Sequence, residues 1–176
     1  MISSKKLKSL QVSLLVWFDI SKREMPWRKT SDPYLIWISE IMLQQTKVKT
    51  AIPYFKRWVN EFPTVESLAA APESKVLKLW EGLGYYSRAR NLLKAARLVV
   101  DQFNCKVPNT LKEIMALPGV GLYTAGAILS IAYKKKIPVL DGNVKRVLSR
   151  FFLLKENGVS TASQKLLWQT AEKILP

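Results

Sequence analysis

Two acidic residues stand where a carboxyl group could take part in bond cleavage. Glu40 lies in an apolar run, between Ser39 and Ile41, and packing of that run would place its carboxyl group beside the core and raise its pKa. Asp141 follows an apolar pair at a position that caps a helix, where free amides would keep it ionised. A protonated acid paired with a fixed carboxylate is the arrangement that cleaves glycosidic bonds through an oxocarbenium-like state.

Each of these residues also has an ordinary structural explanation. Glu40 could lie on the solvent edge of an amphipathic helix, and Asp141 could serve only as an N-cap. The cap and a catalytic role are compatible for Asp141, because a capping carboxylate keeps its charge. The residues alone leave both explanations open.

Residues 117–126, LPGVGLYTAG, predict a tight hairpin between two helices. Pro118 would end the first helix, and Gly119 and Gly121 permit turns with positive φ. The amides at the start of the second helix would then be available to a DNA phosphate. A dinucleotide-binding loop fits poorly, because the glycine spacing is G-x-G-x4-G and no strand precedes it. An ordinary helical turn is the remaining alternative.

A second glycine-containing turn carries aromatic and basic side chains. Tyr85 and Tyr86 precede Arg88 and Arg90 in residues 80–91. The aromatic side chains could wedge into a base stack while the arginines hold phosphates. Ordinary packing of a tyrosine pair at a helix start is the alternative explanation.

Composition limits the remaining chemistry. The chain has 176 residues with one cysteine and no histidine, which excludes a histidine base, an imidazole zinc site and an internal disulfide. Lysine and arginine number 28 against 13 acidic residues, and the net charge of +15 favours a polyanionic partner. Ribosomal and membrane-surface proteins share that charge signature. The apolar stretch at residues 10–18 is too short for a membrane span, so we expect no membrane partner and a cytoplasmic, nucleoid-associated location.

Helical periodicity recurs along the chain, and the predicted fold class is all-α. The expected helices cover residues 6–20, 33–45, 48–60, 64–70, 72–82, 87–103, 110–115, 122–133, 142–153 and 161–175. Ser87 is expected to cap its helix, and capping boxes are expected for Thr110 with Glu113 and for Thr161 with Gln164.

Five segments together resemble the helix-hairpin-helix DNA glycosylases, and most closely the A/G-specific adenine glycosylases of the MutY type. They are PWR at 26–28, SEIMLQQT at 39–46, GLGYYSRARN at 82–91, LPGVGLYTAG at 117–126 and LDGNVKRV at 140–147. The segments occur in the family's order, and the resemblance extends over nearly the whole chain. The resemblance implies a two-lobed fold, in which residues 26–133 form a six-helix lobe that contains the hairpin. Residues 1–25 and 134–176 would form part of a second helical lobe.

The resemblance also implies an activity, which is removal of adenine opposite 8-oxoguanine or guanine in duplex DNA. The adenine nucleotide would first be flipped out of the stack, because an enclosed acid cannot reach a stacked base. Glu40 would protonate adenine N7, Asp141 would stabilise the sugar oxocarbenium ion, and Asn143 would orient it. Tyr123 would line the active site beside Asp141.

Further residues are implied in substrate binding. Trp27 and Arg28 would border the adenine pocket. Gln45 and Tyr85 match positions that fill the stack left by the flipped base and press against the opposing purine. The full set implied in DNA binding is Gln45, Thr46, Leu83, Tyr85, Arg88, Gly119, Gly121 and Lys145.

Three other functions stay open as alternatives. A thymine glycosylase acting on T:G mismatches shares much of the pattern, including a tyrosine in the hairpin. The endonuclease III enzymes, which also cut the strand, carry a lysine where this chain has Tyr123, and a phenol cannot form their Schiff base. Lys145 could trap an abasic sugar slowly. A helical module that binds DNA without catalysis is the non-enzymatic alternative.

The chain departs from the family's pattern in its cysteines. Full-length relatives carry four cysteines for a four-iron four-sulfur cluster and a separate C-terminal domain that recognises 8-oxoguanine. Cys105 alone cannot hold such a cluster, so we expect this sequence to be the N-terminal part of a longer enzyme that works as a monomer. The resemblance further implies a potassium or sodium ion at hairpin carbonyls near Leu117 and Val120.

Overall fold

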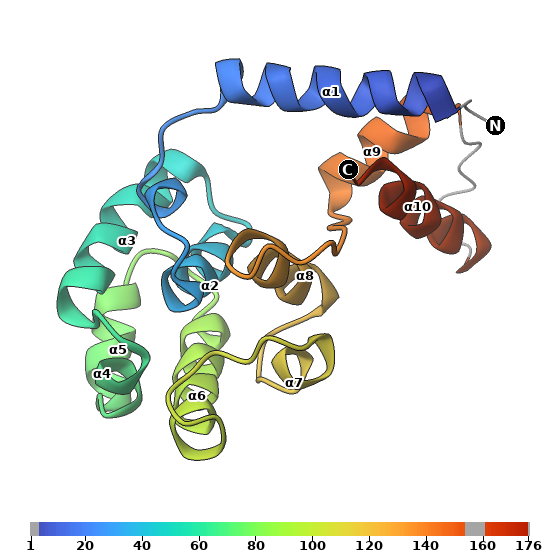
Figure 1. Cartoon of the computed structure of the whole chain (residues 1–176). Helices are drawn as coiled ribbons and strands as arrows, with labels where there is room; N and C mark the ends of the chain where they lie inside the picture. The colour runs from blue at the N-terminus through green and yellow to red at the C-terminus, as the bar shows by residue number, and fades with distance from the viewer. Residues whose placement is uncertain (1–3, 154–160, 176) are drawn as a thin grey trace. The chain divides into compact units, whose positions relative to one another are not determined.

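The computed structural model describes residues 4–153 and 161–175, and every regular element in those residues is a helix. This confirms the all-α class. The elements are α1 (Ser4–Ser21), the 3-10 helix η1 (Pro26–Lys29), α2 (Pro33–Leu43), α3 (Val48–Glu61), α4 (Val65–Ala69), α5 (Glu73–Trp80), α6 (Ser87–Gln102), α7 (Leu111–Met115), α8 (Leu122–Ile131), α9 (Gly142–Phe151) and α10 (Thr161–Ile174) (Figure 1). Within the described residues, none of these helices is both long and apolar enough to cross a membrane.

The chain divides into two compact units, which are described separately. The hairpin unit is Met25–Lys135 and contains η1 to α8. The terminal unit combines Met1–Glu24 with Lys136–Pro176 and contains α1, α9 and α10. The sequence placed the corresponding boundaries at residues 26 and 133.

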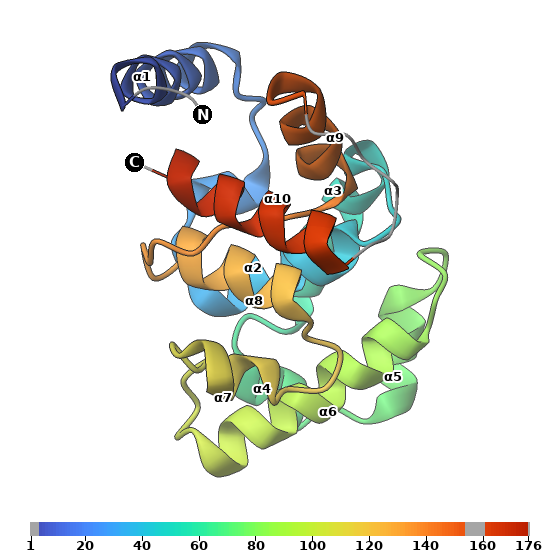
Figure 2. The ribbon, with the colours of Figure 1, turned by 90° about the vertical axis from the view of Figure 1, so that its right-hand side faces the viewer.

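Helix α2 is the centre of the hairpin unit. Its side chains are apolar on nearly every face, as in a helix enclosed by others, and Ile36, Trp37, Ile38 and Met42 are all at most 1% exposed. It packs against α8, α3 and α6. Figure 1 shows α2 between α3 and α8, and Figure 2 shows α8 running beside it.

Amphipathic helices close the outer side of this core. Helix α6 packs on α4 and α5, and α3 also contacts α5. The interior there is aromatic: Trp58 makes edge-to-face contacts with Phe62 at 5.2 Å and with Trp80 at 5.5 Å between ring centroids. Such ring pairs add stability beyond the area that they bury.

Several helix ends differ from the sequence prediction. Ser87 is the first residue of α6 rather than its cap, because Tyr86 occupies the N-cap position and no side chain caps this helix. Thr110 caps α7 by accepting from the Glu113 amide at 3.3 Å, as expected. In a full capping box the Glu113 carboxylate would accept from the Thr110 amide. Here it accepts instead from the Thr110 hydroxyl at 2.5 Å.

The complete capping box lies elsewhere. The Thr64 side chain accepts from the Ser67 amide at 3.3 Å, and the Ser67 hydroxyl oxygen accepts from the Thr64 amide at 3.1 Å. Ser67 takes the third position, where the usual sequence pattern of a capping box has glutamate or glutamine. The expected box at Thr161 and Gln164 depends on Thr161, which lies outside the described side chains.

The predicted hairpin joins α7 to α8, and these two helices pack together. Gly119 has φ +78, a conformation that disfavours any residue with a Cβ atom. A Cβ atom at Gly119 would also lie 2.9 Å from the Cβ atom of Asn91. Gly119 is therefore required both by the turn and by the close approach of α6.

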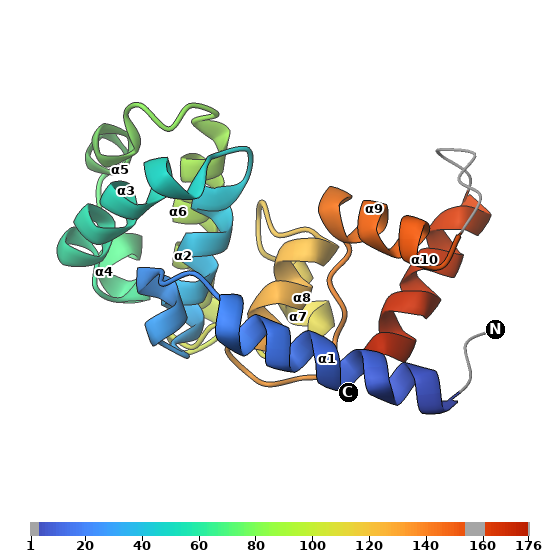
Figure 3. The same cartoon turned by 90° about the horizontal axis from the view of Figure 1, so that it is seen from above.

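The terminal unit has a small core of its own. Leu140 and Leu148 pack with Leu167 and Ala171 of α10. The Gln11 side chain of α1 donates to the Ile174 and Leu175 carbonyls at 3.1 Å, which connects α1 to the end of α10 (Figure 3).

Replacing Gly119 with alanine should destabilise the protein more than the same change at Gly84. Both glycines have positive φ, but a Cβ atom at Gly84 would meet nothing within 4 Å. We expect Gly84→Ala to cost about 1–2 kcal/mol, from backbone strain alone. Gly119→Ala should cost about 2–4 kcal/mol, because Asn91 must also move. Chemical denaturation measures both values, and equal losses would contradict the steric role of Asn91.

Candidate functional site

Glu40 occupies the third turn of α2, in the hairpin unit. Its neighbours Ser39 and Ile41 are buried at 1% and 3% exposure, and Glu40 itself is half-buried. Ser39 donates its hydroxyl to the Ile36 carbonyl at 2.7 Å, so this buried hydroxyl beside Glu40 has a partner within α2. The carboxyl group therefore lies at the border of the core, and its raised pKa stays a prediction.

Asp141 is the N-cap of α9, in the terminal unit. Its Oδ1 accepts from the Val144 amide at 2.7 Å, and its Oδ2 accepts from Asn143 Nδ2 at 3.2 Å. The side-chain amide oxygen of Asn143, Oδ1, in turn accepts from Arg146 Nη2 at 3.0 Å. The predicted cap is thus confirmed, and the carboxylate is fixed through both oxygens in an arrangement suited to stabilising a nearby cation.

Tyr123 is the second residue of α8 and is 37% exposed. The next residue, Thr124, is buried and accepts a hydrogen bond from Gln44 Nε2 at 3.3 Å. This bond connects the start of the hairpin helix to the residue that ends α2. The helix that carries Tyr123 is thereby held against the helix that carries Glu40.

Trp27 and Arg28 lie on η1 in different environments. Trp27 is 6% exposed and packs edge-on against Phe55 at 5.3 Å between ring centroids. Arg28 is exposed. The structure therefore places Trp27 in the packed interior of the hairpin unit and Arg28 on its surface, and their predicted contact with adenine stays a prediction.

Two exposed residues, Gln45 and Tyr85, have left-handed backbones. Their φ angles are +55 and +47, and Tyr85 is 64% exposed. A residue with a Cβ atom pays about 1–2 kcal/mol in this conformation, and such strain often marks functional positions. Leu83, in the same turn as Tyr85, is only 7% exposed and belongs to the core.

Arg88 has partners other than the phosphates expected from the sequence. Its Nη1 donates to the carbonyls of Ile41 (2.9 Å), Met42 (3.3 Å) and Gln44 (2.5 Å). Its Nη2 donates to the carbonyls of Leu83 (3.0 Å) and Gly84 (3.1 Å). Burial lowers the pKa of the guanidinium below its ordinary value, although arginine stays charged at neutral pH. Sequence reasoning missed this role because the partners are backbone carbonyls, and three of them lie 44 to 47 residues away in the sequence.

The other residues predicted to bind DNA fall in three places. Thr46 follows α2, and its hydroxyl donates to the Gln44 carbonyl at 3.3 Å. Gly121 is the N-cap of α8 and supplies no side-chain cap, as a phosphate site at that helix end would require. Lys145 is half-buried on α9, in the terminal unit.

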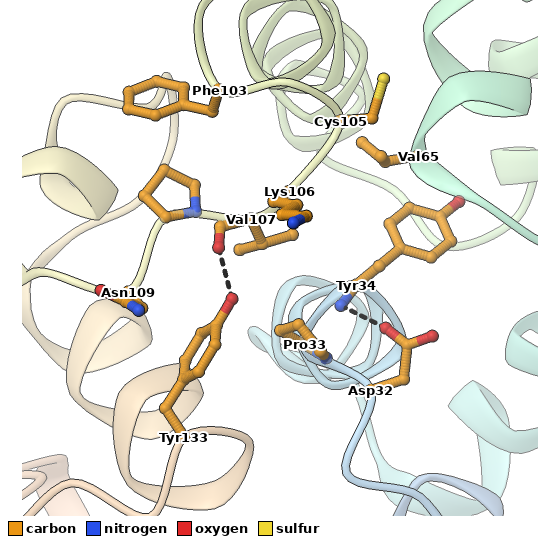
Figure 4. A pocket seen from close by; sticks show the side chains of 11 residues that line it. Asp32, Pro33, Tyr34, Val65, Phe103, Cys105, Lys106, Val107, Asn109 and Tyr133 are labelled. Carbon is orange, nitrogen blue, oxygen red and sulfur yellow. Dashed lines mark hydrogen bonds between the residues drawn. The ribbon is translucent and has the colours of Figure 1, made fainter.

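A cavity of about 400 Å³ lies elsewhere in the hairpin unit, between the start of α2 and the loop after α6 (Figure 4). Tyr34 and Tyr133 border it and donate their hydroxyls to the carbonyls of Phe62 and Val107. Burial raises the pKa of both phenols, so both remain donors. None of the residues predicted to carry chemistry lines this cavity.

The cysteine content does not fit an iron–sulfur cluster. The chain has one cysteine, Cys105, whereas such a cluster takes four thiolates. Within the described residues there is also no group of three or more histidine, cysteine or acidic side chains placed to hold a metal ion. A hairpin alkali ion would have to use backbone oxygens, and the Leu117 carbonyl already accepts from the Val120 amide at 3.1 Å.

Among curated proteins, adenine DNA glycosylases are similar to this chain in sequence. An adenine DNA glycosylase of Buchnera aphidicola (subsp. Baizongia pistaciae) is 46% identical over 165 residues, which are 93% of this chain and 46% of that protein. The human adenine DNA glycosylase is 44% identical over 172 residues, covering 93% of this chain and 32% of the human protein. This chain therefore spans less than half the length of these relatives.

Solved structures resemble the fold closely. A thermostable thymine-DNA glycosylase superposes with a TM-score of 0.89 at 32% identity, over 98% of this chain and 79% of the other. An endonuclease III trapped in a covalent DNA intermediate superposes with a TM-score of 0.80 at 24% identity, over 100% of this chain and 80% of the other, and supports the fold alone. Residues 38–173 match the HhH-GPD superfamily of base excision DNA repair proteins. The chain belongs to that superfamily.

Proposed function

We propose that this protein is a DNA glycosylase that hydrolyses the N-glycosidic bond of adenine paired with 8-oxoguanine or guanine. The observation that carries the proposal is its 43–46% identity to adenine DNA glycosylases across 93% of the chain. The capped Asp141 and the half-buried Glu40 lie inside that matched region and supply the two carboxyl groups that the chemistry needs.

The proposed reaction breaks the bond between the sugar C1′ and adenine N9. Glu40 donates a proton to adenine N7, and the bonding electron pair leaves with the base. The sugar becomes an oxocarbenium ion, which the charge of Asp141 stabilises while Asn143 holds that carboxylate in place. Water attacks C1′ and loses a proton, which gives an abasic site and free adenine.

The proposed DNA contacts combine charge with a few positioned groups. The net charge of +15 attracts the duplex without regard to sequence. The start of α8 at Gly121 offers amides to one phosphate. Gln45 and Tyr85, both exposed, fill the stack that the flipped base leaves.

A thymine glycosylase acting on T:G mismatches is the second candidate. The observation in its favour is the TM-score of 0.89 and 32% identity to a thymine-DNA glycosylase. We place the adenine activity first because the identity to adenine glycosylases is higher. Tyr123 argues against strand cleavage in either case, because a phenol cannot form the Schiff base that strand cleavage needs.

Three duplexes separate these functions. We expect the protein to make a duplex with A opposite 8-oxoguanine, and more slowly one with A opposite G, break at the adenine after hot alkali. A T:G duplex should stay intact, since the pocket would be matched to a purine. Cleavage of T:G alone would instead establish the thymine activity.

Removing either carboxyl group should slow turnover strongly while leaving DNA binding intact. We expect Glu40→Gln to lower the single-turnover rate by about 10²–10⁴-fold, because the acid is lost. Asp141→Asn should lower it by about 10²–10³-fold, because the charge opposite the oxocarbenium ion is lost. Asp101→Asn, an exposed residue on α6, is the matched control with unchanged rate. DNA binding that ignores both changes, in a protein that shows no turnover, would point to the non-enzymatic DNA-binding module.

Tyr123→Lys should convert the protein into one that reacts covalently with DNA. A lysine amine can attack C1′, and borohydride should then trap the protein on the strand. Leu122→Lys adds the same charge at the adjacent, equally exposed position (38%) and should give no such adduct. A strong adduct with the unaltered protein would contradict the proposed water mechanism and implicate Lys145.

A further inference from the structure

Two strained, exposed residues of the hairpin unit, Gln45 and Tyr85, lie in loops that are distant in the sequence. Gln45 follows the end of α2, and Tyr85 lies between α5 and α6. Neither residue is a glycine, so neither left-handed backbone is favoured by its own side chain. Conformations of this kind persist only when surrounding contacts impose them.

A single guanidinium provides contacts of that kind in both loops. Arg88 Nη1 donates to the Gln44 carbonyl at 2.5 Å, and Nη2 donates to the Gly84 carbonyl at 3.1 Å. These are the carbonyls of the peptide bonds immediately before Gln45 and Tyr85. Each bond therefore fixes the orientation of the peptide plane that precedes a left-handed residue, Gln45 or Tyr85.

The same guanidinium also binds the end of α2. Nη1 reaches the carbonyls of Ile41 and Met42 at 2.9 and 3.3 Å. Both lie in the last turn of α2, where carbonyls lack partners within the helix and the helix dipole is negative. A cation is favoured at that position independently of DNA.

Two aromatic rings complete the environment of Arg88. Its guanidinium carbon lies 5.1 Å from the ring centroid of Trp80 and 5.7 Å from that of Tyr85. Trp80 is fully buried, and its Nε1 donates to the same Gly84 carbonyl at 3.0 Å. Arg88 thus contacts the exposed ring of Tyr85 directly as well as through the backbone.

We propose that Arg88 is a positioning residue, which holds Gln45 and Tyr85 together in the conformation that enters the DNA stack, and that it does not bind a phosphate. The proposal rests on the proposed function, in which those two residues contact the duplex. A phosphate contact would require Arg88 to release carbonyls that use both of its terminal nitrogens. Lysine cannot replace it, because an ammonium lacks the planar fork that spans two loops.

Hydrogen exchange on the free protein tests the first half of the proposal. We expect Arg88→Gln and Arg88→Lys to accelerate exchange about 10-fold or more in residues 43–47 and 82–88 together, with little change in α3. The matched control is Arg97→Gln, on the same helix, because Arg97 also donates to backbone carbonyls, those of Ala69 and Ala71. Arg97→Gln should leave both loops protected, and unchanged loops in the Arg88 variants would overturn the proposal.

A fluorescent duplex tests the second half. In a duplex with 2-aminopurine beside the adenine opposite 8-oxoguanine, the unaltered protein should raise the fluorescence as it disturbs the stack. Both Arg88 variants should lose more than about half of that rise, while the slope of log affinity against log salt stays unchanged.

The opposite assignment has a distinct outcome. If Arg88 holds a phosphate, Arg88→Gln should reduce the salt slope by about 1, and Arg88→Lys should behave as the unaltered protein does. Either result would overturn the proposal. The Arg88→Lys variant keeps the test decisive even if Arg88→Gln fails to fold. An unaltered protein that raises no fluorescence contradicts the proposed function instead, and exchange without DNA then still decides whether Arg88 holds the two loops.

Discussion

The arrangement of the hairpin unit depends on one constraint, which is that α2 is apolar on nearly all sides and must be enclosed. Four of its side chains, Ile36, Trp37, Ile38 and Met42, are at most 1% exposed. Helices α3, α6 and α8 cover its faces, and its last turn is left with carbonyl groups that need donors. Packing covers the faces of α2, whereas its C-terminal end is covered by the hydrogen bonds of Arg88.

That enclosure explains why a carboxyl group can be kept at the border of a core. Glu40 is half-buried on this helix, and the residues on either side of it, Ser39 and Ile41, are buried. Asp141 meets the opposite situation, in which its carboxylate stabilises the fold by capping α9. One acidic side chain thus lies at the border of a packed core, and the other caps the backbone at the start of a helix.

The features that the sequence could predict are those with local causes. Helix periodicity predicted the all-α class, and the glycines at 119 and 121 predicted the hairpin, although only Gly119 has positive φ and Gly121 is extended at φ −89. The Asp141 cap followed from its position before a helical run. The Ser87 cap was wrong, because the chain enters α6 through Tyr86 in a helical conformation, so that Ser87 already lies inside the helix. The partners of Arg88 could not be predicted, since they depend on which loops the folded chain brings to it.

Attraction to DNA and the positioning of particular side chains on it depend on different features of a protein with this charge. With 28 lysines and arginines, attraction to a polyanion is spread over many side chains, and the loss of any one changes it little. The geometry of two exposed, strained residues is different, because Gln45 and Tyr85 owe it to a few directed bonds from one guanidinium. Single lysines and arginines can therefore be replaced in such a sequence without loss of DNA binding. Arg88, which positions Gln45 and Tyr85, cannot be exchanged in this way, because neither lysine nor a nearby cation reproduces the geometry of its guanidinium.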